Sequence, residues 1–201
     1  MEAYQRGDFE SAAMLLEQAA AECSAAEALV VLRRLADAYV EMGRYDRALD
    51  ALRRALDLDA HAAAVWNDVG IVCRKMGKEG EAREAFERAH ACDPDNADIL
   101  VNLGAAALRL SDLSGAKKSL ECALRIAPAH PIAHANLALT LALFGRIEEA
   151  EEELRLAVLY GFDGANPIQE RIDGLREIRK IILQRRESPP PDTSGGPNER
   201  P

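Results

Sequence analysis

The run Asp93-Pro94-Asp95-Asn96-Ala97-Asp98 places carboxylates and an amide at the spacing of a calcium-binding loop. Such a loop also needs a glycine at its sixth position, where the chain turns sharply, and a glutamate at its twelfth. Counted from Asp93, the sixth position is Asp98 and the twelfth is Gly104. The run therefore predicts a linker and a capped helix start, with no bound metal.

Histidine and cysteine could supply nitrogen and sulfur ligands. His130 and His134 lie four residues apart at an expected helix start, and His90 and Cys92 have no third ligand nearby. We expect each to be a local packing or polar residue. No Ser-, His- or glycine-rich catalytic motif is present, so we expect neither an enzyme nor a cofactor.

The cysteines form no C-x-x-C pair and no zinc-like spacing. They lie inside helical patterns, where a free thiol acts as a small apolar side chain. Free thiols fit a reducing compartment, so we expect a cytoplasmic protein. The four are Cys23, Cys73, Cys92 and Cys122.

The charge of the chain argues against two kinds of partner. Its formal net charge is −9 and its pI is about 5.0, so it repels phosphate backbones and nucleic acid is not expected to bind. Residues 126–145 carry no charged side chain, but Pro128 and Pro131 interrupt them, which does not suit a bilayer span. No membrane association is expected.

A short segment recurs along the chain. Segments beginning at Gly43, Gly77, Ser111 and Gly145 lie 34 residues apart, and each has an alanine five residues after its start. Apolar residues make up 48% of the chain and aromatic residues only 4%, a composition that favours closely packed helices over a β-sandwich. We therefore expect a series of similar helix pairs.

Residues 63–96 contain Trp66, Val69-Gly70 and Cys73, followed by Ala82, Phe86, Ala89 and Pro94. This pattern resembles the tetratricopeptide signature, in which Trp, Leu-Gly and Tyr precede Ala, Phe and Pro. The resemblance implies an all-α fold, a right-handed superhelical array of antiparallel helix pairs (an α-solenoid) with a C-terminal capping helix. Ser111 takes the place of the turn glycine, so we expect strain or a different turn there.

The period divides the chain into seven parts, and both ends depart from a complete unit. The first part should leave Met14, Leu15 or Leu16 partly uncovered, which permits either self-association or a start inside a longer protein. The parts are an incomplete repeat (1–28), four repeats (29–62, 63–96, 97–130 and 131–164), a capping helix (165–187) and a disordered Pro/Gly-rich tail (188–201). One face of the capping helix carries Ile168, Ile172, Leu175, Ile178 and Ile182.

In the family that the chain resembles, the first helices of the units line a concave groove. The resemblance predicts a groove that is charged near the N-terminus and apolar, with amides, near the C-terminus. Its residues are Arg33, Arg34, Asp37, Asn67, Asp68, Ile71, Val101, Asn102, Ala105, Ala135, Asn136 and Leu139.

Asn102 and Asn136 occupy equivalent places one unit apart. Two such amides resemble the asparagine ladder by which some members of the family hold a peptide backbone. Contacts between neighbouring helices are the alternative explanation for these two residues. The Lys/Asn/Arg clamp that grips a C-terminal carboxylate in other members has no matching residues.

The sequence therefore predicts a non-enzymatic interaction scaffold or adaptor that binds a peptide or helix of another protein in its concave groove. A regulatory or targeting domain of a larger enzyme is the first alternative. An assembly factor for a bacterial envelope complex is the second.

Overall fold

A computed structural model describes residues 8–22 and 24–187, and within them the side chains of all but 25, 26 and 185–187. The predicted tail at 188–201 and Cys23 lie outside the described residues. The described part is all-helical, with no strand. Its helices are α2 (Phe9–Glu22), α3 (Ala25–Glu41), α4 (Tyr45–Leu58), α5 (Ala63–Lys75), α6 (Glu79–Cys92), α7 (Ala97–Arg109), α8 (Leu113–Ile126), α9 (Pro131–Leu143), α10 (Ile147–Leu159) and α11 (Ala165–Glu187).

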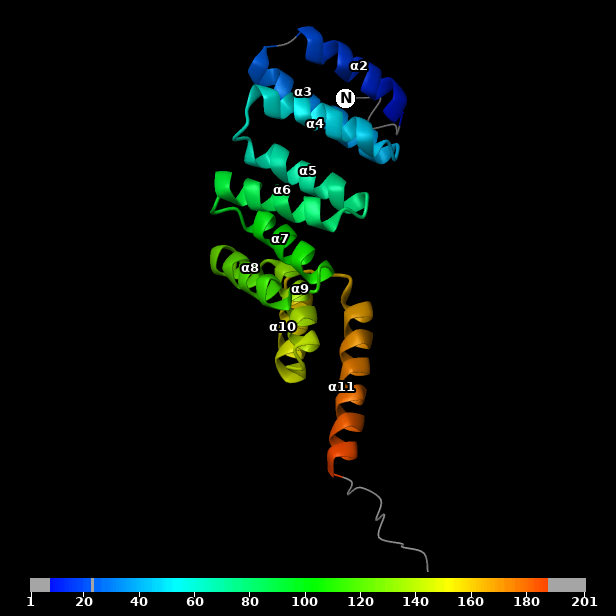
Figure 1. The fold of residues 1–201 in the computed structure, drawn as a ribbon, viewed down its shortest axis with the longest axis vertical. Coiled ribbons are helices and arrows are strands. Elements are labelled where there is room, and N and C mark those ends of the chain that lie inside the picture. The colour runs from blue at the N-terminus through cyan, green and yellow to red at the C-terminus, as the bar shows by residue number, and fades with distance from the viewer. Residues whose placement is uncertain (1–7, 23, 188–201) are drawn as a thin grey trace, which may run out of the picture.

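The helices pair and stack in chain order along one axis (Figure 1). α3 pairs with α4, α5 with α6, α7 with α8, and α9 with α10. The first helices of successive pairs also contact one another, α3 with α5, α5 with α7 and α7 with α9. This architecture confirms the predicted α-solenoid.

Small residues in the first helices admit large residues of the second helices. A Cβ atom added to Gly70 would lie 2.4 Å from the ring of Phe86, which is fully buried. A Cβ atom added to Gly104 would lie 2.7 Å from Leu120 Cγ. Burying a side chain of this size contributes about 1.5–3 kcal/mol, and only a small facing residue lets the two helices approach closely enough.

The turn inside each pair has a residue in the left-handed region. Gly43, Gly77 and Gly145 have φ values of 70°, 75° and 78°, and Ser111 has a φ of 61°. The Ser111 turn thus keeps the geometry of the others and is strained, by about 1 kcal/mol for a residue with a side chain. Asp112, the next residue, accepts a hydrogen bond from Gly115 N at 2.9 Å. A helix N-cap of this kind contributes about 1 kcal/mol, which offsets the strain at Ser111.

At the N-terminal end, α2 packs against α3. Met14 and Leu15 are 65% and 58% exposed, as expected for an incomplete unit. Glu17 accepts hydrogen bonds from Tyr39 and Arg54 and so ties α2 to both helices of the next pair. α3 begins at Ala25, before the predicted boundary at residue 29, because Ser24 and Glu27 form a capping box there.

At the C-terminal end, α11 packs on α9 and α10. Ile172 is fully buried, and Ile168 and Leu175 are partly buried against the same core. Ile178 and Ile182 are 54% and 49% exposed, so the predicted apolar stripe is covered only in its first half. The reason is length, because α11 has 23 residues and α9 and α10 have 13 each, and Figure 1 shows α11 continuing past them. None of the described helices has the length and apolar character needed to cross a membrane.

Candidate functional site

All twelve residues predicted for the groove lie on the first helices α3, α5, α7 and α9. These helices contact one another from unit to unit, so they form one continuous row along the array. On α5, Asn67, Asp68 and Ile71 share one helical face by the 3.6-residue period. We call the surface formed by these twelve residues the inner face.

The N-terminal part of the inner face is charged. Arg33 Nε and Asp68 Oδ2 are 2.6 Å apart, in an ion pair that joins α3 to α5. The side chains of Arg34 and Asp37 are 57% and 50% exposed, and their closest nitrogen and oxygen atoms are 4.0 Å apart. The predicted charged end therefore includes an inter-unit pair as well as charges that remain open to solvent.

Asp37 is the acid of this end with an altered proton affinity. Partial burial raises its pKa above the ordinary value, and the nearby carboxylate of Asp68 raises it further, against the lowering effect of Arg34 and Arg33. The negative charge of Asp37 is thus incompletely compensated within the described residues. A cationic group of a partner would relieve this deficit.

The centre of the inner face holds an amide chain. Asn102 Nδ2 donates to Asn67 Oδ1 at 2.9 Å, and Arg74 Nη1 donates to Asn102 Oδ1 at 3.5 Å. Asn102 therefore makes a contact between neighbouring helices, which was the alternative explanation to a peptide-binding asparagine ladder. An amide has two donor hydrogens and two acceptor lone pairs, so Asn102 keeps one of each.

Toward the C-terminus the inner face is less accessible than the sequence suggests. Val101 and Ala135 are only 5% and 1% exposed, so they offer almost no surface to a ligand. Asn136 is half-buried and has no side-chain hydrogen bond among the described residues, so its amide is free for a partner. Ala105 and Leu139 are also half-buried and give this end its apolar character, and the half-buried Ile71 adds an apolar side chain on α5.

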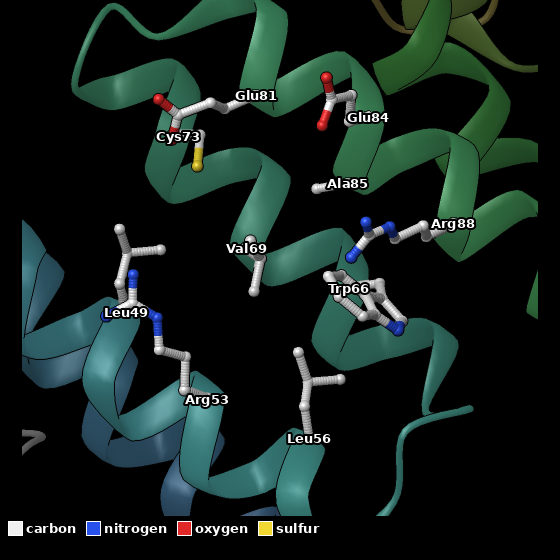
Figure 2. A pocket seen from close by; sticks show the side chains of 10 residues that line it. All are labelled: Leu49, Arg53, Leu56, Trp66, Val69, Cys73, Glu81, Glu84, Ala85 and Arg88. Carbon is white, nitrogen blue, oxygen red and sulfur yellow. The ribbon is translucent and has the colours of Figure 1, made fainter.

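A second concavity, which the sequence did not reveal, lies between α4 and α6 with α5 at its base (Figure 2). Its volume is about 320 Å³. Trp66, Val69 and Cys73 point into it from the α5 face opposite to Asn67, Asp68 and Ile71. We call this concavity the α4–α6 cleft.

Charge is arranged along the α4–α6 cleft. At one end the Arg88 guanidinium lies over the Trp66 ring, 4.7 Å from its centroid, and Trp66 Nε1 donates to Ala60 O at 2.9 Å. At the other end Glu81 lies near Cys73, where burial and then this carboxylate raise the pKa of the thiol. The cysteine is therefore held as a neutral thiol and is a poor nucleophile.

His130 and His134 make local hydrogen bonds, whereas the buried Nδ1 of His90 has no partner among the described residues. Nδ1 of the buried His134 is 2.6 Å from Glu153 Oε2, and its Nε2 is 2.9 Å from Pro128 O. His130 caps α9 by accepting from Ala133 N, and contacts Asp98 of α7. Among the described residues no three His, Cys, Asp or Glu side chains form a metal-binding group, and Cys73, Cys92 and Cys122 are free thiols.

The sequence contained a signal for the α4–α6 cleft. Arg53 and Arg88 line opposite walls, and the residues 34 positions later are Glu87 and Cys122. Side chains required by repeat packing recur with the period, whereas side chains that serve one junction do not. Trp66 was interpreted only as a signature residue of the repeat.

Together, the stacked helix pairs, the small-to-large contacts and the left-handed turns define a tetratricopeptide-type repeat protein. The solved structures that resemble the chain agree. It matches Pseudomonas aeruginosa PilF with a TM-score of 0.72 and 23% identity, covering 92% of this chain and 87% of that one. It also matches YrrB, described as a tetratricopeptide protein with an unusual peptide-binding site, with a TM-score of 0.62 and 19% identity, covering 86% and 98%.

Within that class, the chain belongs to the family of the CABIN1 N-terminal domain, whose pattern matches residues 9–139. A curated relative, Calcineurin-binding protein 1 of Arabidopsis thaliana, is 30% identical over 103 residues. That alignment covers 50% of this chain and 6% of the relative. The match thus spans only a small part of that relative's length.

Proposed function

We propose that the chain is a non-enzymatic interaction scaffold whose inner face binds a peptide or helical segment of another protein. The observation that carries this proposal is the amide chain of Asn67 and Asn102, which lies on two adjacent first helices and keeps unused donors and acceptors. A peptide backbone presents one donor and one acceptor per residue, so spare amide groups along a groove suit it.

The two ends of the inner face would fix the direction of the bound segment. Asp37, whose charge is incompletely compensated, favours a basic side chain at the α3 end. The half-buried Leu139 favours apolar side chains toward α9. Because buried polar groups are costly when unpaired, a segment in the reverse orientation would bind less tightly.

The test is affinity capture of partners by the wild-type chain and by the Asn102→Ala/Asn136→Ala variant, compared by mass spectrometry. The double variant should lose the specific partner while remaining folded, as measured by circular dichroism. Asn136→Ala alone is the more selective variant, because the Asn136 side chain makes no hydrogen bond among the described residues. Glu121→Ala, on the second helix α8, is the control. Undiminished capture by the double variant would refute the inner face as the site.

A second candidate function is a regulatory or targeting domain of a larger protein, an enzyme included. The small share of Calcineurin-binding protein 1 that the chain covers favours it. Sequencing the complete gene would decide, since a neighbouring catalytic domain is directly recognisable.

The location and self-association of the chain are further proposals. The free thiols Cys73, Cys92 and Cys122 support a reducing compartment such as the cytoplasm, which cell fractionation would test. The exposed Met14 and Leu15 support self-association through α2. A sedimentation mass equal to one chain would contradict it.

A further inference from the structure

We propose that the α4–α6 cleft is a second binding site, which takes a segment of a partner protein carrying an apolar side chain close to a carboxylate. It lies on the α5 face opposite to the inner face, so the two sites could be occupied together. The proposal does not depend on what binds the inner face.

The shape and lining of the α4–α6 cleft suit one large apolar side chain. Leu49 and Leu56 line it from α4, and Val69 and the half-buried Trp66 line it from α5. Figure 2 shows their side chains directed into the space between the helices. Its volume of about 320 Å³ lies at the lower end of the range of ligand pockets and exceeds the size of an aromatic side chain.

Two guanidinium groups of the α4–α6 cleft keep unused donors, Arg53 at the Cys73 end and Arg88 at the Trp66 end (Figure 2). Arg88 stacks on Trp66 and has no carboxylate partner among the described contacts, and Arg53 makes a single bond to Asp50 Oδ1 at 3.0 Å. A guanidinium has five donors, so both side chains keep several. Glu81 lies near Cys73, at the Arg53 end, and Glu84 lines the same α6 wall, so Arg88 at the Trp66 end is the guanidinium placed farthest from Glu81 (Figure 2).

The charge pattern therefore orients the ligand. Its apolar side chain would occupy the space above Val69, with its carboxylate toward Arg88 at the Trp66 end (Figure 2). Protein segments commonly anchor a side chain in a pocket that is lined by aromatic and apolar residues and has a few directed polar groups.

The same constellation is absent from the next junction of the array. Thirty-four residues on, Glu87, Cys122 and Leu100 take the places of Arg53, Arg88 and Trp66. Their neighbours keep the repeat pattern, since Ala82 and Phe86 are matched by Ala116 and Leu120. Arg53 is thus not repeated in either neighbouring unit, which favours a recognition role, whereas Arg88 has an arginine counterpart one unit earlier, Arg54.

The chain carries its own reporter for this site, because Trp66 is its only tryptophan. The probe is the peptide acetyl-Ala-Phe-Glu-Ala-amide, and the matched probe replaces its glutamate with glutamine. The emission of Trp66 and its indole NMR signal are followed during titration. We expect a saturable change with the Glu peptide and binding about threefold or more weaker with the Gln peptide, as the loss of exposed ion pairs predicts.

The matched variants are Arg53→Met/Arg88→Met, which keep the apolar stems but remove both charges, and Arg54→Met. Arg54 is the neighbour of Arg53 but pairs with Glu17 of α2, 2.9 Å away, outside the cleft. We expect the double variant to bind the Glu and Gln peptides equally. Arg54→Met should retain the wild-type preference.

Three results would overturn the proposal. They are no saturable change of the Trp66 signals, equal binding of both peptides by the wild-type chain, or an unchanged preference in the double variant. Decanoate is titrated as a free apolar acid, and tighter binding of decanoate than of the Glu peptide would overturn the assignment to a protein segment. If the double variant fails to fold, the comparison of the two peptides on the wild-type chain still decides.

Discussion

The close contact between Gly70 of α5 and Phe86 of α6 offers a sharp test of the packing argument, through Gly70→Ala. The new Cβ would lie 2.4 Å from the ring of Phe86, and that ring is fully buried and has no free space to enter. Overpacking of this kind costs about 1–3 kcal/mol. Replacing a helical glycine with alanine returns about 1 kcal/mol, so we expect a net loss of up to about 2 kcal/mol of unfolding free energy.

Gly174→Ala is the matched control, because nothing lies within 4 Å of its added Cβ and it too is helical. It should stabilise the chain by about 0.5–1 kcal/mol. A further variant, Gly70→Ala/Phe86→Leu, recreates the small-to-large pair found at Ala36 and Leu52 and should recover part of the loss.

The assay is urea unfolding followed both by helical circular dichroism and by the emission of Trp66, which reports on the α5–α6 pair itself. Local reporting matters because the units of a repeat array can unfold separately. If Gly70→Ala is as stabilising as Gly174→Ala, or the double variant is no better than Gly70→Ala, the close-approach argument is refuted.

Three further predictions follow from single side chains. Ser111→Gly should raise the melting temperature, because it relieves about 1 kcal/mol of left-handed strain at φ 61° and gives back part of that gain as chain entropy; an unchanged or lower value would contradict it. Asp37→Asn should stabilise the chain at neutral pH. Because the pKa of Asp37 is higher in the folded chain than its ordinary value, ionisation of Asp37 costs stability above the folded-state pKa and costs none below the ordinary pKa. The advantage of the variant should therefore vanish in urea titrations near pH 3. His134→Leu should cost about 2–4 kcal/mol in urea unfolding, because it leaves the Glu153 carboxylate and the Pro128 carbonyl unpaired, and adding Glu153→Leu should restore part of that loss.

The sequence predicted the fold because each unit repeats one solution to the same packing problem. Alanine or glycine at the close approach, a large apolar residue opposite, and glycine in the turn recur every 34 residues, so local pattern and global fold agree. The ends were predicted less completely. The sequence placed Ile178 and Ile182 on the apolar face of a cap, but the lengths of α9 and α10 leave both side chains exposed.

The candidate sites depended more heavily on the tertiary structure. The family resemblance predicted that the twelve inner-face residues lie on the first helices, but it did not distinguish the half-buried Asn136 from the buried Ala135 next to it. Nor could it show that Asn102 is hydrogen-bonded to Asn67, because that contact depends on the rotation between neighbouring units.

The acidic array of helix pairs and its period were therefore determined by the sequence, because they follow from composition and local spacing. Only the tertiary structure decided which polar groups are already satisfied and where α4, α5 and α6 leave a cleft. Arg53, Trp66 and Arg88 belong to three helices, and their convergence depends on how one pair docks on the next. That docking is a sum of many weak contacts that no short sequence pattern encodes.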